Sequence, residues 1–377
     1  MMLEFGKELD NTVQIMTRNY RGLAALDESV GTMGKRFLAF DIDNTAENRR
    51  HWREILLTSS PEFTIAIGGV ILFTEQLDQR ADDGKTLPEL IQELGMVTGV
   101  KTDLGQASIA GTDETVLQGL DKLHERCRTY HHKGARFSKF RAIFPVDEAK
   151  GYPSARAVYI NAFTLARMAS ICQQCGLVPV VEPEILANGT HTIEQHANAC
   201  TRVWTAVFDE LKAQEVDLTR MILKTSMVAP GLDSTQHIIP ADIAQMTLNT
   251  LMATVPAAVP AVCFLSGGFK EQESTGMLNA INLHAARLGK ANAPWQLSFS
   301  FARALQGSAM KAWAGNPANE ETAQQCFVKR CRANHLAAQG LYKGEDALDR
   351  ETKAHVFAEL IGRTFEADNV LPAEHEA

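Results

Sequence analysis

Short segments rich in β-branched and apolar residues recur along this chain, and each is followed by polar residues or glycine. They repeat at intervals of roughly forty residues, which is the combined length of a strand, a helix and two loops. Eight segments fit this description, at residues 22–26, 66–73, 97–101, 135–144, 177–184, 221–228, 259–265 and 295–302. We therefore predict eight strands that are evenly spaced along the chain.

Amphipathic stretches with helical spacing lie between these strands. The clearest are at residues 45–58, 114–132, 154–174, 191–211 and 242–254. Strands that alternate strictly with helices form a parallel sheet. Eight repeats favour a closed barrel over an open sheet, and none of the strands is followed by the GxGxxG turn of a dinucleotide site. The predicted fold class is α/β, a single (β/α)8 TIM barrel.

The length of the chain, 377 residues, suits one barrel with additions at both ends. A leading helix is expected within residues 1–20, and the barrel with a terminal helix within residues 21–341. Asn316, which is followed by proline, is typical of a helix start, and Gly340 is typical of a helix end. Residues 342–377 are polar and acidic, so we expect a C-terminal tail on the surface.

Charge and hydropathy limit the possible partners. The formal net charge is −8, so no broad positive field is expected for nucleic acid or an anionic membrane surface. The N-terminal residues lack the pattern of a signal peptide, and the longest apolar stretch, at residues 255–265, is short and contains two prolines. A soluble, cytoplasmic protein is expected, in which a local basic pocket can still bind an anionic small molecule.

The seven cysteines fit reduced thiols better than a disulfide framework, because their number is odd and they are spread along the chain. Cys172 and Cys175 form a CxxC pair, but the sequence has no second pair to complete a zinc site. Free cysteine is often a small buried residue, and we favour that interpretation over a redox or metal site. His191 and His196 lack a standard metal-ligand spacing and are better explained as the start of a helix.

Active sites of closed barrels form at the carboxyl ends of the strands, so polar residues there are the first functional candidates. They are frequent in this sequence: Asp27, Glu28, Lys101, Lys139, Arg141, Glu182, Glu184, Lys224, Ser266, Gly267, Gly268 and Arg303. Alternation along a strand places Lys139 with Arg141, and Glu182 with Glu184, on the same face. The sequence therefore predicts a charged pocket at one end of the barrel.

Lys224 lies within the sixth predicted strand, in the segment MILKTSM. Burying a lysine is costly, and desolvation together with a neighbouring cation such as Lys139 favours the neutral amine. A neutral amine can attack a ketone and form a Schiff base. The alternative is a lysine whose stem lies along the barrel while its ammonium group reaches solvent. The strand context alone does not decide between these two.

Three carboxylates are candidates for proton transfer. Glu182 and Glu184 can exchange protons beside an amine or pair with Lys139, and ordinary structural ion pairing explains them equally well. Asp27 can act as a base for a sugar hydroxyl, or it can be the N-cap of the next helix. The residues alone leave both pairs of alternatives open.

Two sets of residues suit phosphate groups. The serine and two glycines at residues 266–268 offer closely spaced backbone N–H groups. Arg303, after the eighth strand, adds a guanidinium group that can donate two parallel hydrogen bonds to a phosphate. Barrel enzymes often bind phosphate at the loops after strands seven and eight, which favours this interpretation over a plain turn. On the opposite side Ser29, Lys101 and Arg141 can hold a second phosphate, although each alone is more often a solvated or salt-bridged side chain.

Long motifs at these positions resemble the class I fructose-bisphosphate aldolases, which act through a lysine Schiff base. The motifs are LAALDES at 23–29, NTAENRR at 44–50, IGGVILF at 67–73, FSKFRA at 137–142, VPVVEPEIL at 178–186, ILKTSMV at 222–228, FLSGG at 264–268 and FSFARALQ at 299–306. They run in order from about residue 20 to residue 342. Several long motifs on successive strands are far more specific than a single lysine.

The resemblance implies a role for each candidate. Lys224 would form the imine, Glu182 would act as acid and base in dehydrating the carbinolamine, and Asp27 would deprotonate the hydroxyl group during carbon–carbon cleavage. Lys139 and Glu184 would orient and polarise the intermediate. The reaction implied is the reversible cleavage of fructose 1,6-bisphosphate in glycolysis and gluconeogenesis.

The resemblance also implies two phosphate sites. The phosphate of the dihydroxyacetone phosphate half would be held by Ser266, Gly267 and Arg303. The other phosphate would face Ser29, Lys35, Lys101 and Arg141. No metal or cofactor is implied, because the protonated imine is itself the electron sink. The expected partners are a sugar phosphate and further copies of the chain, as a homotetramer.

Three differences from the familiar forms of this family are visible. Ala302 replaces a glycine that many relatives have before the phosphate-binding arginine, and Thr225 and Ser226 replace proline and asparagine. The chain ends in His-Glu-Ala and lacks a terminal tyrosine. Rival hypotheses are a lysine-dependent aldolase for another ketose phosphate, a metal-dependent aldolase, and a scaffold with little turnover.

Overall fold

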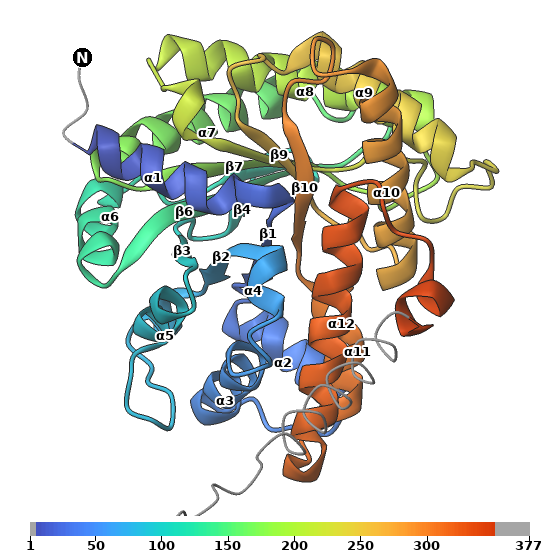
Figure 1. Ribbon diagram of the computed structural model, residues 1–377. Helices are drawn as coiled ribbons and strands as arrows, with labels where there is room; N and C mark the ends of the chain where they lie inside the picture. Colours follow the sequence, from blue (N-terminus) through green and yellow to red (C-terminus); the bar gives the residue numbers. More distant parts are fainter. Residues whose placement is uncertain (1–4, 351–377) are drawn as a thin grey trace, which may run out of the picture.

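A computed structural model describes residues 5–350 and has a closed barrel of parallel strands surrounded by helices (Figure 1). The order around the barrel is β1-β10-β9-β8-β7-β6-β3-β2. These strands are Gly22–Leu26 (β1), Ile67–Leu72 (β2), Val97–Lys101 (β3), Ala135–Phe144 (β6), Val178–Ile185 (β7), Ile222–Thr225 (β8), Ala261–Phe264 (β9) and Gln296–Phe301 (β10). The predicted TIM barrel is confirmed, and each predicted strand overlaps one observed strand.

Helices connect successive strands and cover the outside of the barrel (Figure 1). They are α1 (Gly6–Thr17), α2 (Val30–Leu38), α3 (Ala46–Leu57), α4 (Phe63–Ala66), α5 (Leu87–Glu93), α6 (Leu123–His132), α7 (Ala155–Gln174), α8 (Ile193–Ala213), α9 (Pro240–Thr254), α10 (Glu271–Leu288), α11 (Arg303–Trp313) and α12 (Glu320–Ala338). Several begin where a serine or threonine side chain accepts a backbone N–H of the first turn, as Thr45 does for α3 and Ser154 for α7.

The barrel has two apolar layers because its strands are buried on both faces. The inner layer contains side chains such as Leu23, Phe137 and Ile222, and it is continued by Leu9 and Met16 of α1. The outer layer lies between the strands and the surrounding helices. Because α1 packs on the inner layer near the starts of the strands, it closes that end of the barrel.

The predicted helix at residues 114–132 is wrong in its first part. The segments Gln106–Ser108 (β4) and Thr115–Leu117 (β5) form an antiparallel hairpin, and α6 begins only at Leu123. The β-branched residues of β5 favour a strand. Gly119 has a φ of 126°, which a helix does not allow, so the chain breaks before α6.

The terminal helix begins and ends where the sequence predicts. Asn316 caps a 3-10 turn, Pro317–Asn319, by accepting the backbone N–H of Ala318, and α12 follows directly. Gly340, with a φ of 71°, lies just beyond the end of α12. Both predicted signals are therefore confirmed.

The two ends of the chain differ in part from expectation. A 3-10 turn, Arg18–Tyr20, follows α1 in place of a continuous leading helix, because Asn19 has a φ of 55°. At the other end, residues 351–377 of the predicted acidic tail lie outside the described residues. The segment just before them is held on α12 by an ion pair between Glu345 and Arg330, 2.8 Å apart.

The cysteines of the described region are free thiols, and Cys172 and Cys175 are buried. The interpretation of this CxxC pair as two buried residues is therefore confirmed. As for membranes, each helix within residues 5–350 is too short or too polar to serve as a transmembrane span.

His191 and His196 lie at the start of α8, with Thr192 between them as its N-cap, so the helix-start interpretation is confirmed. The two imidazole rings are buried and stacked, with their centroids 5.2 Å apart. Burial lowers the pKa of His196 to about 3, and the neighbouring His191 adds to this effect. Burial also lowers the pKa of His191.

We expect the free energy of unfolding to fall as the pH drops below about 6.5, because the unfolded chain then binds a proton that buried His196 does not. The pKa of His196 in the folded protein is about 3, below the unfolded value, so the loss continues down to that pH. Between pH 6.5 and pH 5 this histidine should account for about 2 kcal/mol. Urea unfolding at the two pH values measures the difference.

The variant His196→Gln should lose this part of the pH dependence. The exposed His237 offers a matched control, and His237→Gln should behave like the unmodified protein. An unchanged pH dependence in His196→Gln would contradict the expectation.

Candidate active site

The carboxyl ends of the barrel strands surround a cavity of about 980 Å³, at the end opposite α1. Every residue that the sequence singled out for catalysis or substrate binding lines this cavity: Asp27, Ser29, Lys35, Lys101, Lys139, Arg141, Glu182, Glu184, Lys224, Ser266, Gly267 and Arg303. They come from strand ends and from the segments that follow them. This is the end of a barrel at which active sites form.

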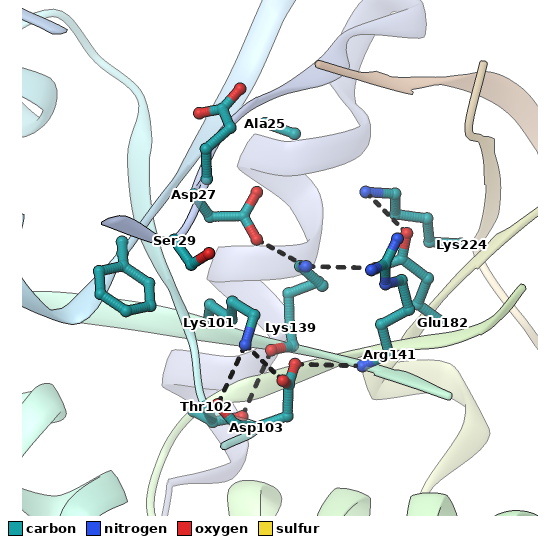
Figure 2. Close-up of polar contacts among 12 residues, drawn as sticks. Ala25, Asp27, Ser29, Lys101, Thr102, Asp103, Lys139, Arg141, Glu182 and Lys224 are labelled. Atoms are coloured by element: carbon teal, nitrogen blue, oxygen red, sulfur yellow. Dashed lines mark hydrogen bonds and ion pairs between the residues drawn. The ribbon is translucent and has the colours of Figure 1, made fainter. Parts of the chain in front are cut away.

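Four buried charged side chains form a continuous row in the cavity, and we call them the charged row (Figure 2). Lys224 Nζ lies 3.0 Å from Glu182 Oε1. Lys139 Nζ lies 3.3 Å from Glu182 Oε2 and 2.6 Å from Asp27 Oδ2. The four residues come from β8, β7, β6 and the end of β1, so closure of the barrel is what brings them together.

These positions exclude one alternative that the sequence leaves open for Lys224 and one for Asp27. Lys224 is only 5% exposed and is paired with Glu182, so its ammonium group does not extend into solvent. Asp27 is not an N-cap, because the side chain of Ser29 caps α2 by accepting the backbone N–H of Thr32 at 3.3 Å.

The charged row sets the protonation of its own carboxylates. Burial raises the pKa of Asp27, but the ammonium groups of Lys139 and Lys224 outweigh burial and lower that pKa to about 2. Burial likewise opposes ionisation of Glu182, and the same two lysines lower its pKa. The pKa of Lys139 is raised, because Asp27 and Glu182 together outweigh its burial. Both carboxylates are therefore ionised at neutral pH.

A second group of charges lies beside the charged row. Arg141 Nη1 lies 2.8 Å from Glu184 Oε2, yet burial still raises the pKa of Glu184. Lys101 forms an ion pair with Asp103, and the backbone N–H of Arg141 donates to Asp103 Oδ2 at 3.3 Å (Figure 2). Lys101 and Arg141 are thus connected through one carboxylate.

The loop after β9 faces α11 across the cavity. Gly267 and Gly268 have φ values of 57° and 94°, which favour glycine. A Cβ atom at Gly268 would lie 2.9 Å from Leu232 Cδ1 and 3.7 Å from Arg303 Nη2, so the backbone here also has little space. Within residues 5–350 no carboxylate lies within 4.0 Å of the Arg303 guanidinium. This part of the cavity therefore offers an unneutralised cation beside a glycine loop.

The residues that differ from the familiar forms have contacts of their own. Thr225 Oγ1 donates to the carbonyl oxygen of Pro183 at 3.2 Å, and Ser226 Oγ donates to that of Ile185 at 2.9 Å. These bonds attach the end of β8 to β7 and so help to hold Lys224 beside Glu182. Ala302 lines the cavity.

Among the other residues that line the cavity, Arg36, Asp103 and Ser300 were not predicted as site residues. Asp103 follows Lys101 by two residues, a spacing that could have identified it. Ser300 lies on β10, and its buried hydroxyl has no hydrogen-bond partner among the described residues. Arg36, on α2, pairs with Glu28, and nothing in its helical surroundings distinguishes it from an ordinary surface arginine.

Known proteins share this architecture. The family model described as class-I fructose-bisphosphate aldolase matches residues 8–360. The chain belongs to the class-I fructose-bisphosphate aldolase family. Fructose-bisphosphate aldolase B of Gallus gallus is 46% identical over 352 residues, which cover 93% of this chain and 95% of that protein. The Homo sapiens aldolase B is 47% identical over 337 residues, 89% of this chain and 91% of that protein.

The fold of this aldolase also matches that of a solved aldolase structure. Fructose-bisphosphate aldolase from Plasmodium falciparum superposes with a TM-score of 0.87 at 41% sequence identity, covering 92% of this chain and 98% of the other. The family resemblance inferred from the motifs is thereby confirmed, and this aldolase is an enzyme that acts as a carbon–carbon lyase.

The group of side chains best spaced for a metal ion lies outside the cavity. Within residues 5–350, one group of three side chains has suitable spacing, namely His51, Glu54 and Asp82. None of the three lines the cavity. Arg50 pairs with both Glu54 and Asp82, and a guanidinium between two carboxylates opposes the binding of a cation there.

Proposed function

We propose that this aldolase cleaves fructose 1,6-bisphosphate reversibly to dihydroxyacetone phosphate and glyceraldehyde 3-phosphate, with Lys224 as the Schiff-base residue. The observation that carries the assignment is the buried contact of 3.0 Å between Lys224 Nζ and Glu182 Oε1. Attack on the ketone requires a neutral amine. Glu182 is ionised and its Oε1 lies 3.0 Å from Lys224 Nζ, so it can accept the proton of Lys224.

The amine then adds to C2 of the substrate and forms a carbinolamine. Glu182, which now carries a proton, donates it to the carbinolamine hydroxyl, and water leaves. The product is a protonated imine on Lys224. One carboxylate in contact with both lysines can thus serve as base in one step and as acid in the next.

Cleavage requires a base at the C4 hydroxyl, and we assign this role to Asp27. Its pKa of about 2 keeps it ionised, and Lys139 Nζ, 2.6 Å away, holds the carboxylate in place. As the proton moves to Asp27, the C3–C4 bond breaks and its electron pair moves to the imine nitrogen. The aldehyde leaves, and an enamine remains on Lys224. Protonation at C3 and hydrolysis then release dihydroxyacetone phosphate.

The two phosphates would lie at opposite sides of the charged row. We assign the phosphate of the dihydroxyacetone phosphate half to Ser266, Gly267 and Arg303, because a glycine loop and an unneutralised guanidinium suit a dianion. The other phosphate is assigned to the opposite group, which consists of Ser29, Lys35, Lys101 and Arg141. Glu184, paired with Arg141, would orient that arginine.

Family likeness supports three further proposals. We propose that the protein acts as a homotetramer, that it works in the cytoplasm, and that its reaction serves glycolysis and gluconeogenesis. Size-exclusion chromatography with light scattering measures the first of these directly.

Chelation tests the metal-free mechanism. We expect kcat/KM for fructose 1,6-bisphosphate to be unchanged after dialysis against EDTA, because the protonated imine replaces a Lewis acid as electron sink. Cleavage is followed through the appearance of glyceraldehyde 3-phosphate. Loss of activity with EDTA and its recovery with a divalent cation would overturn the mechanism. Turnover of a different ketose phosphate in place of this one would overturn the substrate assignment.

A further inference from the structure

The two phosphate sites of the proposed function differ in how their cations are neutralised. On the side of the second phosphate, three cations already have carboxylate partners, in the pairs Lys101–Asp103, Arg141–Glu184 and Arg36–Glu28, whereas the exposed Lys35 has none within residues 5–350. On the other side, Arg303 has no such partner within residues 5–350. A phosphate can therefore approach Arg303 without displacing an anion, whereas contact of the second phosphate with Lys101 or Arg141 competes with a carboxylate that is already there.

Asp103 contacts both Lys101 and the backbone of Arg141 (Figure 2). Its side chain is almost fully buried, at 2% exposure, while that of Lys101 is 17% exposed and faces the cavity. One oxygen of Asp103 accepts the backbone N–H of Gly105 at 3.0 Å, and the other accepts that of Arg141 at 3.3 Å. The carboxylate is thus fixed to the backbone. Lys101, whose Nζ also donates to the carbonyl oxygen of Asp103 at 3.2 Å, is the more exposed partner of the pair.

We propose that Asp103 is a specificity-determining positioning residue, which holds Lys101 when the second phosphate is absent and competes with that phosphate for the lysine. The proposal rests on the assignment of Lys101 to the second phosphate. A ketose bisphosphate must draw Lys101 away from Asp103. A ketose monophosphate with its phosphate at C1 leaves the pair intact. Asp103 therefore lowers the ratio of kcat/KM for a ketose bisphosphate to kcat/KM for a ketose 1-phosphate.

The competition follows from simple electrostatics. The second phosphate is stabilised by contact with the Lys101 ammonium group, but Asp103 then loses its own contact with that group. The net stabilisation of the bound phosphate is therefore smaller than it would be without the carboxylate. Removing its charge should strengthen binding of the second phosphate and leave the first phosphate site, on the far side of the charged row, nearly unaffected.

The test compares kcat/KM for fructose 1,6-bisphosphate with kcat/KM for fructose 1-phosphate. In Asp103→Asn we expect the ratio of the two to rise by about three- to tenfold, the range for one partly exposed charge pair, through a lower KM for the bisphosphate. In a Lys101→Met background, adding Asp103→Asn should leave the ratio unchanged, because the residue acts through Lys101. A general structural defect would lower turnover of both substrates together.

Two kinetic results would overturn the proposal: a ratio that stays constant or falls in Asp103→Asn, or the same rise with and without Lys101. A crystal structure of Asp27→Asn, which should form the imine while cleavage of the bisphosphate is nearly lost, reduced with borohydride in the presence of fructose 1,6-bisphosphate, tests it with Lys101 and Asp103 both unmodified. We expect Lys101 on the second phosphate and Asp103 left with its two backbone N–H groups. An adduct on Lys224 with Lys101 still on Asp103 would refute only this proposal, whereas absence of an adduct on Lys224 would refute the proposed mechanism.

Discussion

Replacing Lys224 by methionine should lower kcat/KM for fructose 1,6-bisphosphate by about 10⁵-fold, the scale seen when a covalent nucleophile is removed. Methionine fills a similar volume without an amine, so the buried space between β7 and β9 stays occupied. Glu182 and Asp27 remain in place but have no imine on which to act. A coupled assay of the aldehyde product measures the loss.

The control for this prediction is Lys212→Met, which removes an exposed lysine near the end of α8 and should leave activity unchanged. Circular dichroism shows whether each variant is folded. A folded Lys224→Met enzyme with more than about a hundredth of the original activity would contradict the assignment of the nucleophile.

The second large effect is expected for Asp27→Asn. Removal of a general base lowers turnover by about 10² to 10⁴-fold, so cleavage of the bisphosphate should fall within that range. Formation of the imine should persist, because Lys224 and Glu182 are still in contact. Borohydride should therefore still trap dihydroxyacetone phosphate on the variant, even though cleavage is nearly lost.

Asp10→Asn is the matched control, because Asp10 pairs with Arg220 on the protein surface, away from the cavity. It should change neither trapping nor cleavage. If Asp27→Asn lost trapping as well as cleavage, Asp27 would be needed before the carbon–carbon bond breaks. If Asp27→Asn cleaved the substrate at the normal rate, the base would have to be another group.

Much of the fold could be predicted because each strand and each helix carries its own periodic signal. The eight strands were found from short buried runs, and a closed barrel then placed their polar ends together. The hairpin of β4 and β5 was missed, because three-residue strands are too short to show alternation and the helical pattern of α6 lies next to them.

In the candidate site, contacts between residues that are distant in the sequence could not be predicted. The position of Lys224 in a strand left a buried amine and an ammonium group in solvent both open, because the contact with Glu182 that decides its burial joins two strands. The alternatives for Asp27 likewise depended on whether Ser29 would cap α2. The spacing of Asp103 from Lys101 is a local signal, but its contact with the backbone of Arg141 joins the ends of two neighbouring strands and could not be predicted from that spacing.

The most direct measurement of the central claim is borohydride reduction in the presence of dihydroxyacetone phosphate, followed by peptide mass mapping. The mechanism predicts one stable adduct, on the peptide that contains Lys224, and no adduct in Lys224→Met. An adduct on any other lysine, or equal trapping in Lys224→Met, would contradict it.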